Sequence, residues 1–293
     1  MIHSSSSAFV TVGWLAVHLN EPQIRILDGS WYLPGAQRDP RQEFLDAHVP
    51  GAQFFDIDSI ARKDTALPHM LPSANEFSHV LNTLGIESND FVVVYDSAGL
   101  FSAARVWWTL RVFGHDKVAI LKGGLAAWRR ANMPVVASES NAASINTSAA
   151  QAVWRSEYYA HCADVHRAVT GGTAQIIDAR SHGRFMGVEP EPRQELSSGH
   201  IPGSLNIHYS TLIDPEQGCL HDQTTLQQLF GTAGVDLSCP IITSCGSGIT
   251  ACIIAVALHE LGVDPVAVFD GSWAEWGSTP GLPIATSQSY NCV

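Results

Sequence analysis

Residues 241–262, IITSCGSGITACIIAVALHELG, join a short apolar run to a long one through a loop with two glycines. The first run, 241–244, has the length of a buried strand, and the second, 251–261, has the length of a helix. Cys245 stands where the strand gives way to the loop. Ligands of parallel α/β sheets gather beyond the carboxyl ends of the strands, so this stretch predicts an α/β domain with a functional loop at Cys245.

The landmarks around this stretch occur twice in the chain. ILD at 26–28 recurs as IID at 176–178, HVPGA at 48–52 as HIPGS at 200–204, VVVYD at 92–96 as IITSC at 241–245, and the pair Gly123 and Trp128 as Gly271 and Trp276. The offsets are 150, 152, 149 and 148 residues. Four matches in one order at nearly one offset predict two copies of a single domain.

A segment rich in Ser, Ala and Asn separates the copies at residues 137–152. That composition is typical of a linker. We therefore expect a first domain at residues 1–136, a linker at 137–155 and a second domain at 156–293.

Each copy alternates β-rich runs with helical patterns. The expected strands are 24–28, 91–95 and 118–121 in the first copy and 175–178, 241–244 and 266–269 in the second, and the long helices are 103–113 and 251–261. Strand, helix, strand implies a parallel sheet with helices on both faces. The predicted fold class is α/β, with two such domains in tandem.

The composition excludes several classes of function. The formal net charge of −12, from 16 basic and 28 acidic residues, argues against nucleic acid or an anionic membrane as the main partner. The amino terminus lacks the basic start and apolar core of a secretory signal, and the run 249–258 is too short to cross a bilayer. We expect a cytoplasmic protein whose six cysteines stay mostly reduced. The absence of a CxxC pair argues against a zinc site. No metal or organic cofactor is implied by the sequence.

The loop after Cys245 has the features of an anion cradle. Gly246 and Gly248 allow the backbone to curl with its N–H groups inward, and a helix begins near Thr250. Unpaired N–H groups at a helix start favour a thiolate, so Cys245 is predicted to be reactive rather than a small core residue. Cysteine phosphatases end a longer loop with an arginine, whereas Ala251 follows Thr250 here. The short loop suits something smaller than phosphate, such as a single sulfur atom.

These segments together resemble the rhodanese superfamily. The resemblance rests on the tandem repeat, the two HxPG segments, GGLAAW at 123–128, DGSW at 270–273 and CGSGITA at 245–251, and covers about residues 8–285. It implies two rhodanese-like domains. Thiosulfate sulfurtransferases of this superfamily carry basic residues after the cysteine, as in CRKGVT. CGSGIT is instead similar to 3-mercaptopyruvate sulfurtransferases, with Ile249 in place of the usual Val.

The resemblance also implies a set of site residues. In the family, the arginines that match Arg184 and Arg193 bind the carboxylate and keto oxygens of mercaptopyruvate. A proposed Ser–His–Asp relay maps onto Ser247, His69 and Asp58. The loop backbone that would contact the substrate is formed by Gly246, Gly248, Ile249 and Thr250.

The reaction implied is sulfur transfer through a Cys245 persulfide. Sulfur from 3-mercaptopyruvate would pass to a thiol such as thioredoxin, or to cyanide, with release of pyruvate. The first copy has Asp96 at the position of the cysteine, so it is expected to be inactive. Two alternatives stay open: a thiosulfate:cyanide sulfurtransferase, and a non-catalytic persulfide carrier or interaction module.

Overall fold

The computed structural model describes residues 7–137, 150–193 and 195–286, so most of the expected linker lies outside the described residues. The chain divides into two compact units. The first comprises Met1–Lys63, Leu71–Arg155 and Asp214–Leu220, and the second comprises Asp64–Met70, Ser156–Ile213 and His221–Val293. Each unit contains a five-stranded sheet whose paired strands run parallel.

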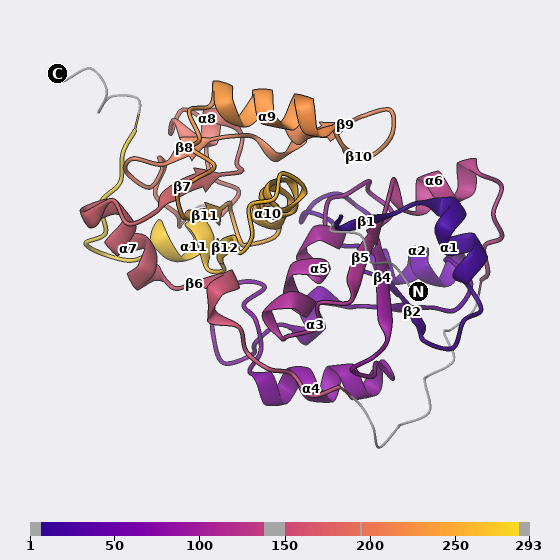
Figure 1. Cartoon of the computed structure of the whole chain (residues 1–293). Helices are drawn as coiled ribbons and strands as arrows, with labels where there is room; N and C mark the ends of the chain where they lie inside the picture. Colours follow the sequence, from indigo (N-terminus) through magenta and orange to yellow (C-terminus); the bar gives the residue numbers. More distant parts are fainter. Residues whose placement is uncertain (1–6, 138–149, 194, 287–293) are drawn as a thin grey trace. The chain divides into compact units, whose positions relative to one another are not determined.

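The first unit alternates strands with helices along the chain. Its elements are β1 (Phe9–Val10), α1 (Val12–His18), β2 (Ile24–Asp28), α2 (Pro40–Asp46), β3 (Ala52–Phe54), α3 (Ile57–Ile60), α4 (Ala74–Thr83), β4 (Phe91–Tyr95), α5 (Ala103–Val112), β5 (Val118–Leu121) and α6 (Gly124–Arg130). The strand order is β1-β5-β4-β2-β3. Figure 1 shows α1, α2 and α6 on one face of this sheet and α3 and α5 on the other.

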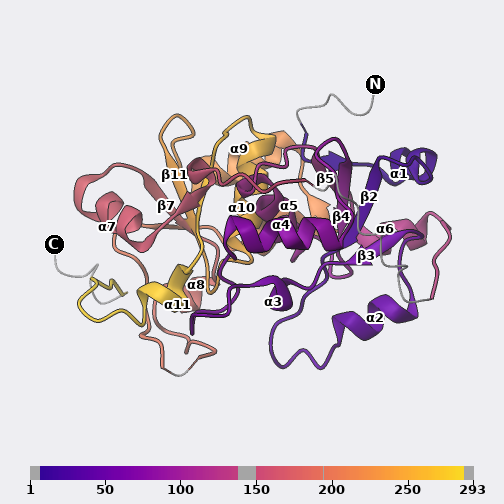
Figure 2. The same cartoon turned by 90° about the horizontal axis from the view of Figure 1, so that it is seen from below.

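Both faces of the first sheet are buried, which explains the apolar composition of its strands. All five residues of β4, FVVVY, are buried, as expected where helices cover a parallel sheet on both sides. On one face, Val93 and Tyr95 pack with Phe44 of α2 and Trp128 of α6. On the other, α4 and α5 lie close together (Figure 2). Phe77 of α4 stacks on Phe113 at the end of α5.

The second unit repeats this architecture. Its elements are η1 (Ser156–Tyr158), β6 (Tyr159–Ala160), α7 (Cys162–Gly171), β7 (Gln175–Asp178), α8 (His182–Phe185), β8 (Leu205–Asn206), η2 (Tyr209–Leu212), α9 (Gln223–Thr232), β11 (Ile241–Ser244), α10 (Ala251–Glu260), β12 (Ala267–Phe269) and α11 (Ser272–Trp276). Two short strands, β9 (Ile213–Asp214) and β10 (Cys219–Leu220), follow η2, and the segment Asp214–Leu220 belongs to the first unit. The strand order β6-β12-β11-β7-β8 corresponds position by position to that of the first sheet, and β9 and β10 form a separate two-stranded sheet.

The predicted fold class is confirmed by these two parallel sheets. Five of the six predicted strands have the expected bounds, and the sixth begins at Ala267 rather than at 266. The two long helices end one residue early, at Val112 and Glu260, because the last residue of each predicted range is the C-cap.

Repeated side-chain contacts accompany the repeated topology. His48 stacks on Phe44 and lies 2.7 Å from its carbonyl oxygen through Nδ1, and His200 does the same with Phe185. Both histidines are buried, so the two HxPG segments fix local structure. The indole N–H groups of Trp128 and Trp276 likewise each donate to a proline carbonyl beyond their helix.

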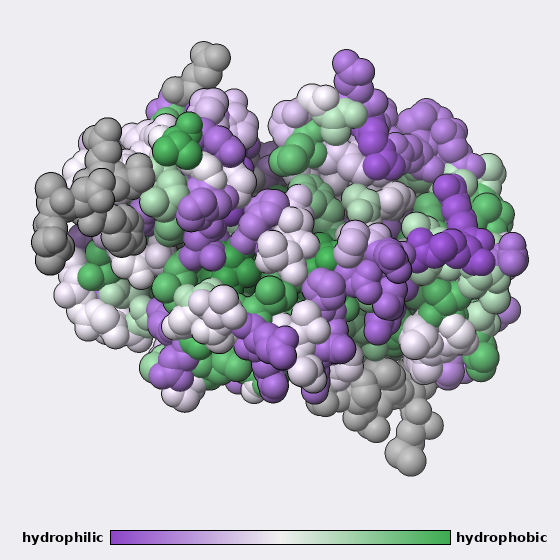
Figure 3. All heavy atoms as spheres, turned by 90° about the horizontal axis from the view of Figure 1, so that it is seen from above, coloured by the Kyte–Doolittle hydropathy of each residue, from purple (hydrophilic) through white to green (hydrophobic). Residues whose placement is uncertain are grey.

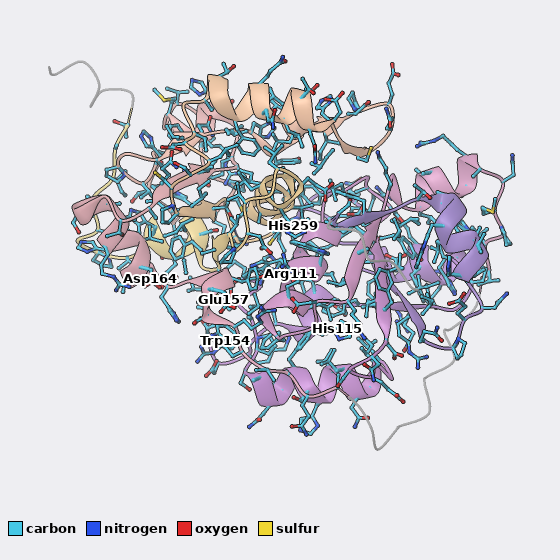
Figure 4. The ribbon with its side chains drawn as sticks, in the orientation of Figure 1. Arg111, His115, Trp154, Glu157, Asp164 and His259 are labelled. Carbon is cyan, nitrogen blue, oxygen red and sulfur yellow. The ribbon has the colours of Figure 1, made fainter. Side chains whose placement is uncertain are left out.

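Residues 150–155, expected to be part of the linker, pack on the first unit. The Ala150 N–H donates to the Ile86 carbonyl at 2.9 Å, and the Arg155 guanidinium pairs with Asp116 at 2.6 Å. Trp154, labelled in Figure 4, meets Phe113 edge-on. This part of the predicted linker is therefore fixed to the first unit.

The surface is mixed in polarity. Figure 3 shows apolar and polar residues interspersed over the face drawn. Among the described residues, no helix has both the length and the apolar composition needed to span a membrane.

Candidate functional site

Cys245 lies directly after β11 and before α10, at the carboxyl edge of the second sheet. Its side chain is buried, and its sulfur accepts a hydrogen bond from the Gly248 N–H at 3.2 Å. The Ser272 hydroxyl lies 3.9 Å from the same sulfur. The loop backbone therefore contacts Sγ directly through the Gly248 N–H.

The two loop glycines have different structural roles. Gly248 has a φ of +80°, in the left-handed region that favours glycine. Gly246 does not have a positive φ, which corrects the expectation that both glycines serve to curl the backbone. A Cβ at Gly246 would lie 3.1 Å from Nη2 of Arg184, so a side chain there fits only if the guanidinium moves by a few tenths of an ångström. Substitution at residue 246 would therefore displace the arginine.

Ser272 holds the Cys245 loop through a side-chain hydrogen bond, a role that the sequence did not predict. Its hydroxyl accepts the Cys245 N–H at 3.0 Å and donates to the Phe269 carbonyl at 2.7 Å. It does so with a φ of +49°, which is strained for a residue other than glycine. The first unit has Gly124, with a φ of +56°, at the matching position. The strain is thus retained only in the copy that has the cysteine.

Arg184 is carried by the short helix α8, whose N-cap Ser181 accepts the Arg184 N–H at 3.4 Å. Its side chain is 24% exposed and pairs with Glu191 at 2.5 Å, so a charged edge faces the Cys245 loop and can bind an anion. Arg193, two residues beyond Glu191, is half-buried. The structure places Arg184 against the Cys245 loop, and the roles of Arg184 and Arg193 in substrate binding stay predictions.

Arg180 lies in a buried network of ion pairs. Its guanidinium is buried, bonds to Asp178 at 2.7 Å and to Glu191 at 2.8 Å, and lies 4.3 Å above the Trp273 ring. Burial lowers the pKa of Arg180, but the charges and hydrogen bonds of Asp178 and Glu191 together outweigh this effect, so the pKa is raised overall. Trp273 is fully buried and is a packing residue rather than a pocket wall.

His208 contributes to the electrostatics around Arg184. Burial lowers the pKa of His208, the positive charge of Arg184 lowers it further, and Glu189 opposes both effects. Its Nδ1 lies 2.7 Å from the Ser210 hydroxyl. A neutral imidazole at this place adds no second cation beside Arg184 near neutral pH.

The three residues of the expected relay come from different segments. Ser247 lies in the Cys245 loop, and His69 belongs to Asp64–Met70 of the second unit with a φ of +60°. Asp58 lies on α3 of the first unit, where its carboxylate accepts the Trp31 indole N–H at 2.8 Å. The Trp31 bond was not anticipated, and the relay stays a prediction.

In the first unit, the loop that corresponds to the Cys245 loop surrounds the carboxylate of Asp96. Asp96 is buried, and its Oδ2 accepts backbone N–H groups at 2.8 Å from residues 101, 102 and 103, where α5 begins. Its Oδ1 accepts the Ala98 N–H at 3.1 Å. The inward N–H groups that would receive an anion in a catalytic copy are thus occupied by Asp96.

The described site combines a buried cysteine sulfur, an N–H donor and a neighbouring guanidinium. This arrangement suits covalent transfer of a small group from an anionic donor. Within the described part of the chain, no group of three or more His, Cys, Asp or Glu side chains is placed to hold a metal ion.

Known proteins match this chain over almost its whole length. A family described as Rhodanese-like domain matches residues 11–131 and 161–279. A thiosulfate/3-mercaptopyruvate sulfurtransferase of Arabidopsis thaliana is 45% identical over 98% of this chain and 89% of its own length. The 3-mercaptopyruvate sulfurtransferase of Escherichia coli K12 is 41% identical, over 96% of this chain and 98% of its own.

Solved structures agree with the sequence matches. A crystal structure of the 3-mercaptopyruvate enzyme of Escherichia coli superimposes with a TM-score of 0.81 at 40% identity, covering 91% of this chain and 99% of the other. The Tum1 protein of Saccharomyces cerevisiae superimposes with a TM-score of 0.86 at 33% identity, covering 96% of this chain and 99% of the other.

Proposed function

We propose that this chain, which belongs to the rhodanese family and is a sulfurtransferase, takes sulfur from 3-mercaptopyruvate and carries it on Cys245. Residues 156–293 would form the catalytic domain, residues 1–136 an inactive copy and residues 137–155 the linker. The observation that supports this most strongly is the Cys245 sulfur, which accepts a backbone N–H while the Arg184 guanidinium lies against the same loop.

The first half-reaction breaks a carbon–sulfur bond. The Cys245 thiolate attacks the thiol sulfur of 3-mercaptopyruvate, a sulfur–sulfur bond forms, and the carbon–sulfur electron pair leaves on carbon as the enolate of pyruvate. Arg184 and Arg193 would pair with the carboxylate and the developing enolate oxygen, which offsets charge in the transition state. Protonation of the enolate gives pyruvate, and the persulfide remains on Cys245.

The loop backbone would hold the persulfide. Gly246, Gly248, Ile249 and Thr250 are proposed to surround the outer sulfur, in addition to the N–H of Gly248 that already meets Sγ. In the second half-reaction a thiol such as thioredoxin, or cyanide, attacks this outer sulfur, and the Cys245 thiolate leaves.

The enolate needs a proton donor. We propose Ser247 and His69 for this role, with Asp58 fixing the imidazole tautomer. The second half-reaction produces no enolate and does not require such a relay. The two half-reactions therefore allow the relay to be tested separately from sulfur transfer itself.

The test compares initial rates with mercaptopyruvate and with thiosulfate on one preparation. Mercaptopyruvate should have the higher kcat/KM, and equal or better turnover of thiosulfate would overturn the donor assignment. Mass spectrometry after donor treatment should find one added sulfur on the peptide that contains Cys245. Cys245→Ser should abolish transfer, whereas Cys252→Ser, at a fully buried position on α10, is the matched control. Added sulfur on Cys252 in place of Cys245, or activity in Cys245→Ser, would contradict the mechanism.

A thiosulfate:cyanide sulfurtransferase is the second candidate, because the Arabidopsis relative is described with both donors. The space at Gly246 favours mercaptopyruvate, since a basic side chain there would displace Arg184. A non-catalytic persulfide carrier would show a stable Cys245 persulfide without multiple turnovers. The cytoplasmic location also stays a prediction, to be tested by fractionation, because another Arabidopsis relative is described as mitochondrial.

A further inference from the structure

Four charged side chains form a continuous chain from β7 to the Cys245 loop. Asp178, Arg180 and Glu191 have side chains only 1% exposed, and Arg184 at the outer end is 24% exposed. Consecutive members are 2.7, 2.8 and 2.5 Å apart. The formal charges alternate in sign, so the chain as a whole is neutral.

Glu191 is the link that joins Arg184 to the buried part of this chain. Its Oε2 accepts Nη2 of Arg184 at 2.5 Å, and its Oε1 accepts Nε of Arg184 at 3.3 Å and Nη1 of Arg180 at 2.8 Å. The carboxylate thus binds the Nε–Nη2 edge of Arg184 through both of its oxygens. The edge formed by Nη1 and Nη2 faces Gly246, with Nη2 at 3.1 Å and Nη1 at 3.9 Å from an ideal Cβ position.

Arg184 cannot leave this position without disturbing a buried ion pair. Asp178 already satisfies the Nε and Nη2 groups of Arg180, so Glu191 has capacity to hold Arg184 as well. If Arg184 turned toward solvent, the buried Glu191 carboxylate would lose a partner, which is unfavourable. The helix α8 has only four residues and does not by itself fix the direction of a long side chain. Glu191 therefore pre-organises the guanidinium before any ligand binds.

We propose that Glu191 is a positioning residue that holds Arg184 over the Cys245 loop and thereby selects a planar α-keto carboxylate over tetrahedral thiosulfate. A guanidinium edge pairs with the two coplanar oxygens of a carboxylate through parallel N–H bonds. That pairing depends on the angle of the edge, whereas a tetrahedral anion tolerates a rotated guanidinium. The inference rests on the proposed function, because it concerns the same donor site.

The test is Glu191→Gln, which keeps the volume but turns an amide N–H₂ toward one of the arginines. The kcat/KM for mercaptopyruvate should fall roughly tenfold or more, mainly through KM, and that for thiosulfate should change much less. Glu191→Asp keeps the charge and should recover part of the loss. Glu195→Gln, at an exposed acid of the same loop, is the matched control and should match the wild type.

A double-mutant cycle separates positioning from a general structural role. If Glu191 acts through Arg184, Glu191→Gln should cost little more in an Arg184→Ala background. Additive losses, or equal losses with both donors, would overturn the proposal. Should Glu191→Gln not fold, Glu191→Asp with Arg184→Ala gives the same cycle.

The affinity for pyruvate, measured by titration calorimetry, gives a readout that does not depend on turnover. Glu191→Gln should weaken it, and unchanged affinity would count against positioning. Absence of mercaptopyruvate turnover by the wild-type protein would instead refute the proposed function, so the two failures are distinguishable.

Discussion

Asp28 in the first unit carries a prediction about stability and pH. Its carboxyl group is 1% exposed and accepts the Ser30 N–H at 2.9 Å. Burial raises the pKa of Asp28 from 3.8 to about 6, against the opposing effect of hydrogen bonds from Ser30 and Tyr95, and Asp96 raises it further. The matching residue of the second unit, Asp178, has Arg180 as a partner, whereas Ser30 stands at the position of that arginine.

The direction in which stability changes with pH follows from the proton that Asp28 binds in the folded protein. Between pH 4 and 6 the folded protein holds a proton on Asp28 that the unfolded chain releases. The favourable contribution of Asp28 is therefore complete below about pH 4 and is lost as the pH rises through about 6. A shift of about two pKa units corresponds to roughly 3 kcal/mol. Asp28→Asn cannot ionise and keeps an oxygen for the Ser30 N–H, so its stability relative to wild type should rise by up to about that amount between pH 4 and 7.

Native-state hydrogen exchange on peptides from β2 and β4 is the suitable measurement, because a chain of two units need not unfold in one step. Asp178→Asn is the matched comparison in the second unit, followed on peptides from β7 and β11, and there the substitution should lower stability. It leaves the buried Arg180 without its main partner, which costs about 3–5 kcal/mol. A difference between Asp28→Asn and wild type that does not change with pH would refute the reasoning.

Three further changes test the catalytic unit. Gly246→Ala places a Cβ 3.1 Å from Nη2 of Arg184. It should lower kcat/KM for mercaptopyruvate by about tenfold, and unchanged kinetics would show that the arginine is not needed there. Ser272→Ala removes the acceptor of the Cys245 N–H but keeps the strained φ. In thermal unfolding, its free energy of unfolding should fall by about 1–3 kcal/mol, which is more than for Ser272→Gly. Equal losses in the two variants would contradict the strain argument. His69→Asn should slow pyruvate formation far more than discharge of the persulfide to cyanide, and equal slowing would leave His69 a structural residue.

The fold was predictable because its signals are local and occur twice. Buried parallel strands are continuous apolar runs, as in β4 and β11, and the repeat confirmed each of them independently. The Cys245 loop was predictable for the same reason, since strand, glycine and helix signals meet within ten residues.

The supporting residues of the site could not be found in that way. Glu191 resembles any acid of a polar loop until the chain brings it to Arg180 and Arg184. The role of Gly246 depends on a side chain 62 positions away in the sequence, Arg184, so backbone preference suggested the wrong reason for it. A comparison of the two copies offers the missing signal, because Ser272 replaces Gly124 in the copy with the cysteine.

The inactive copy provides the last test of what the site requires. Three N–H groups converge on Asp96 at 2.8 Å, so a thiol introduced by Asp96→Cys should ionise more readily than an ordinary cysteine. The first unit nevertheless has Ser30 at the position of Arg180, and its Arg38 is paired with Glu43. In a Cys245→Ser background, Asp96→Cys should therefore show a thiolate in an ultraviolet titration but no turnover of mercaptopyruvate. Pyruvate release by that double variant would mean that an N–H cradle alone suffices, and that anchored arginines are dispensable for breaking the carbon–sulfur bond.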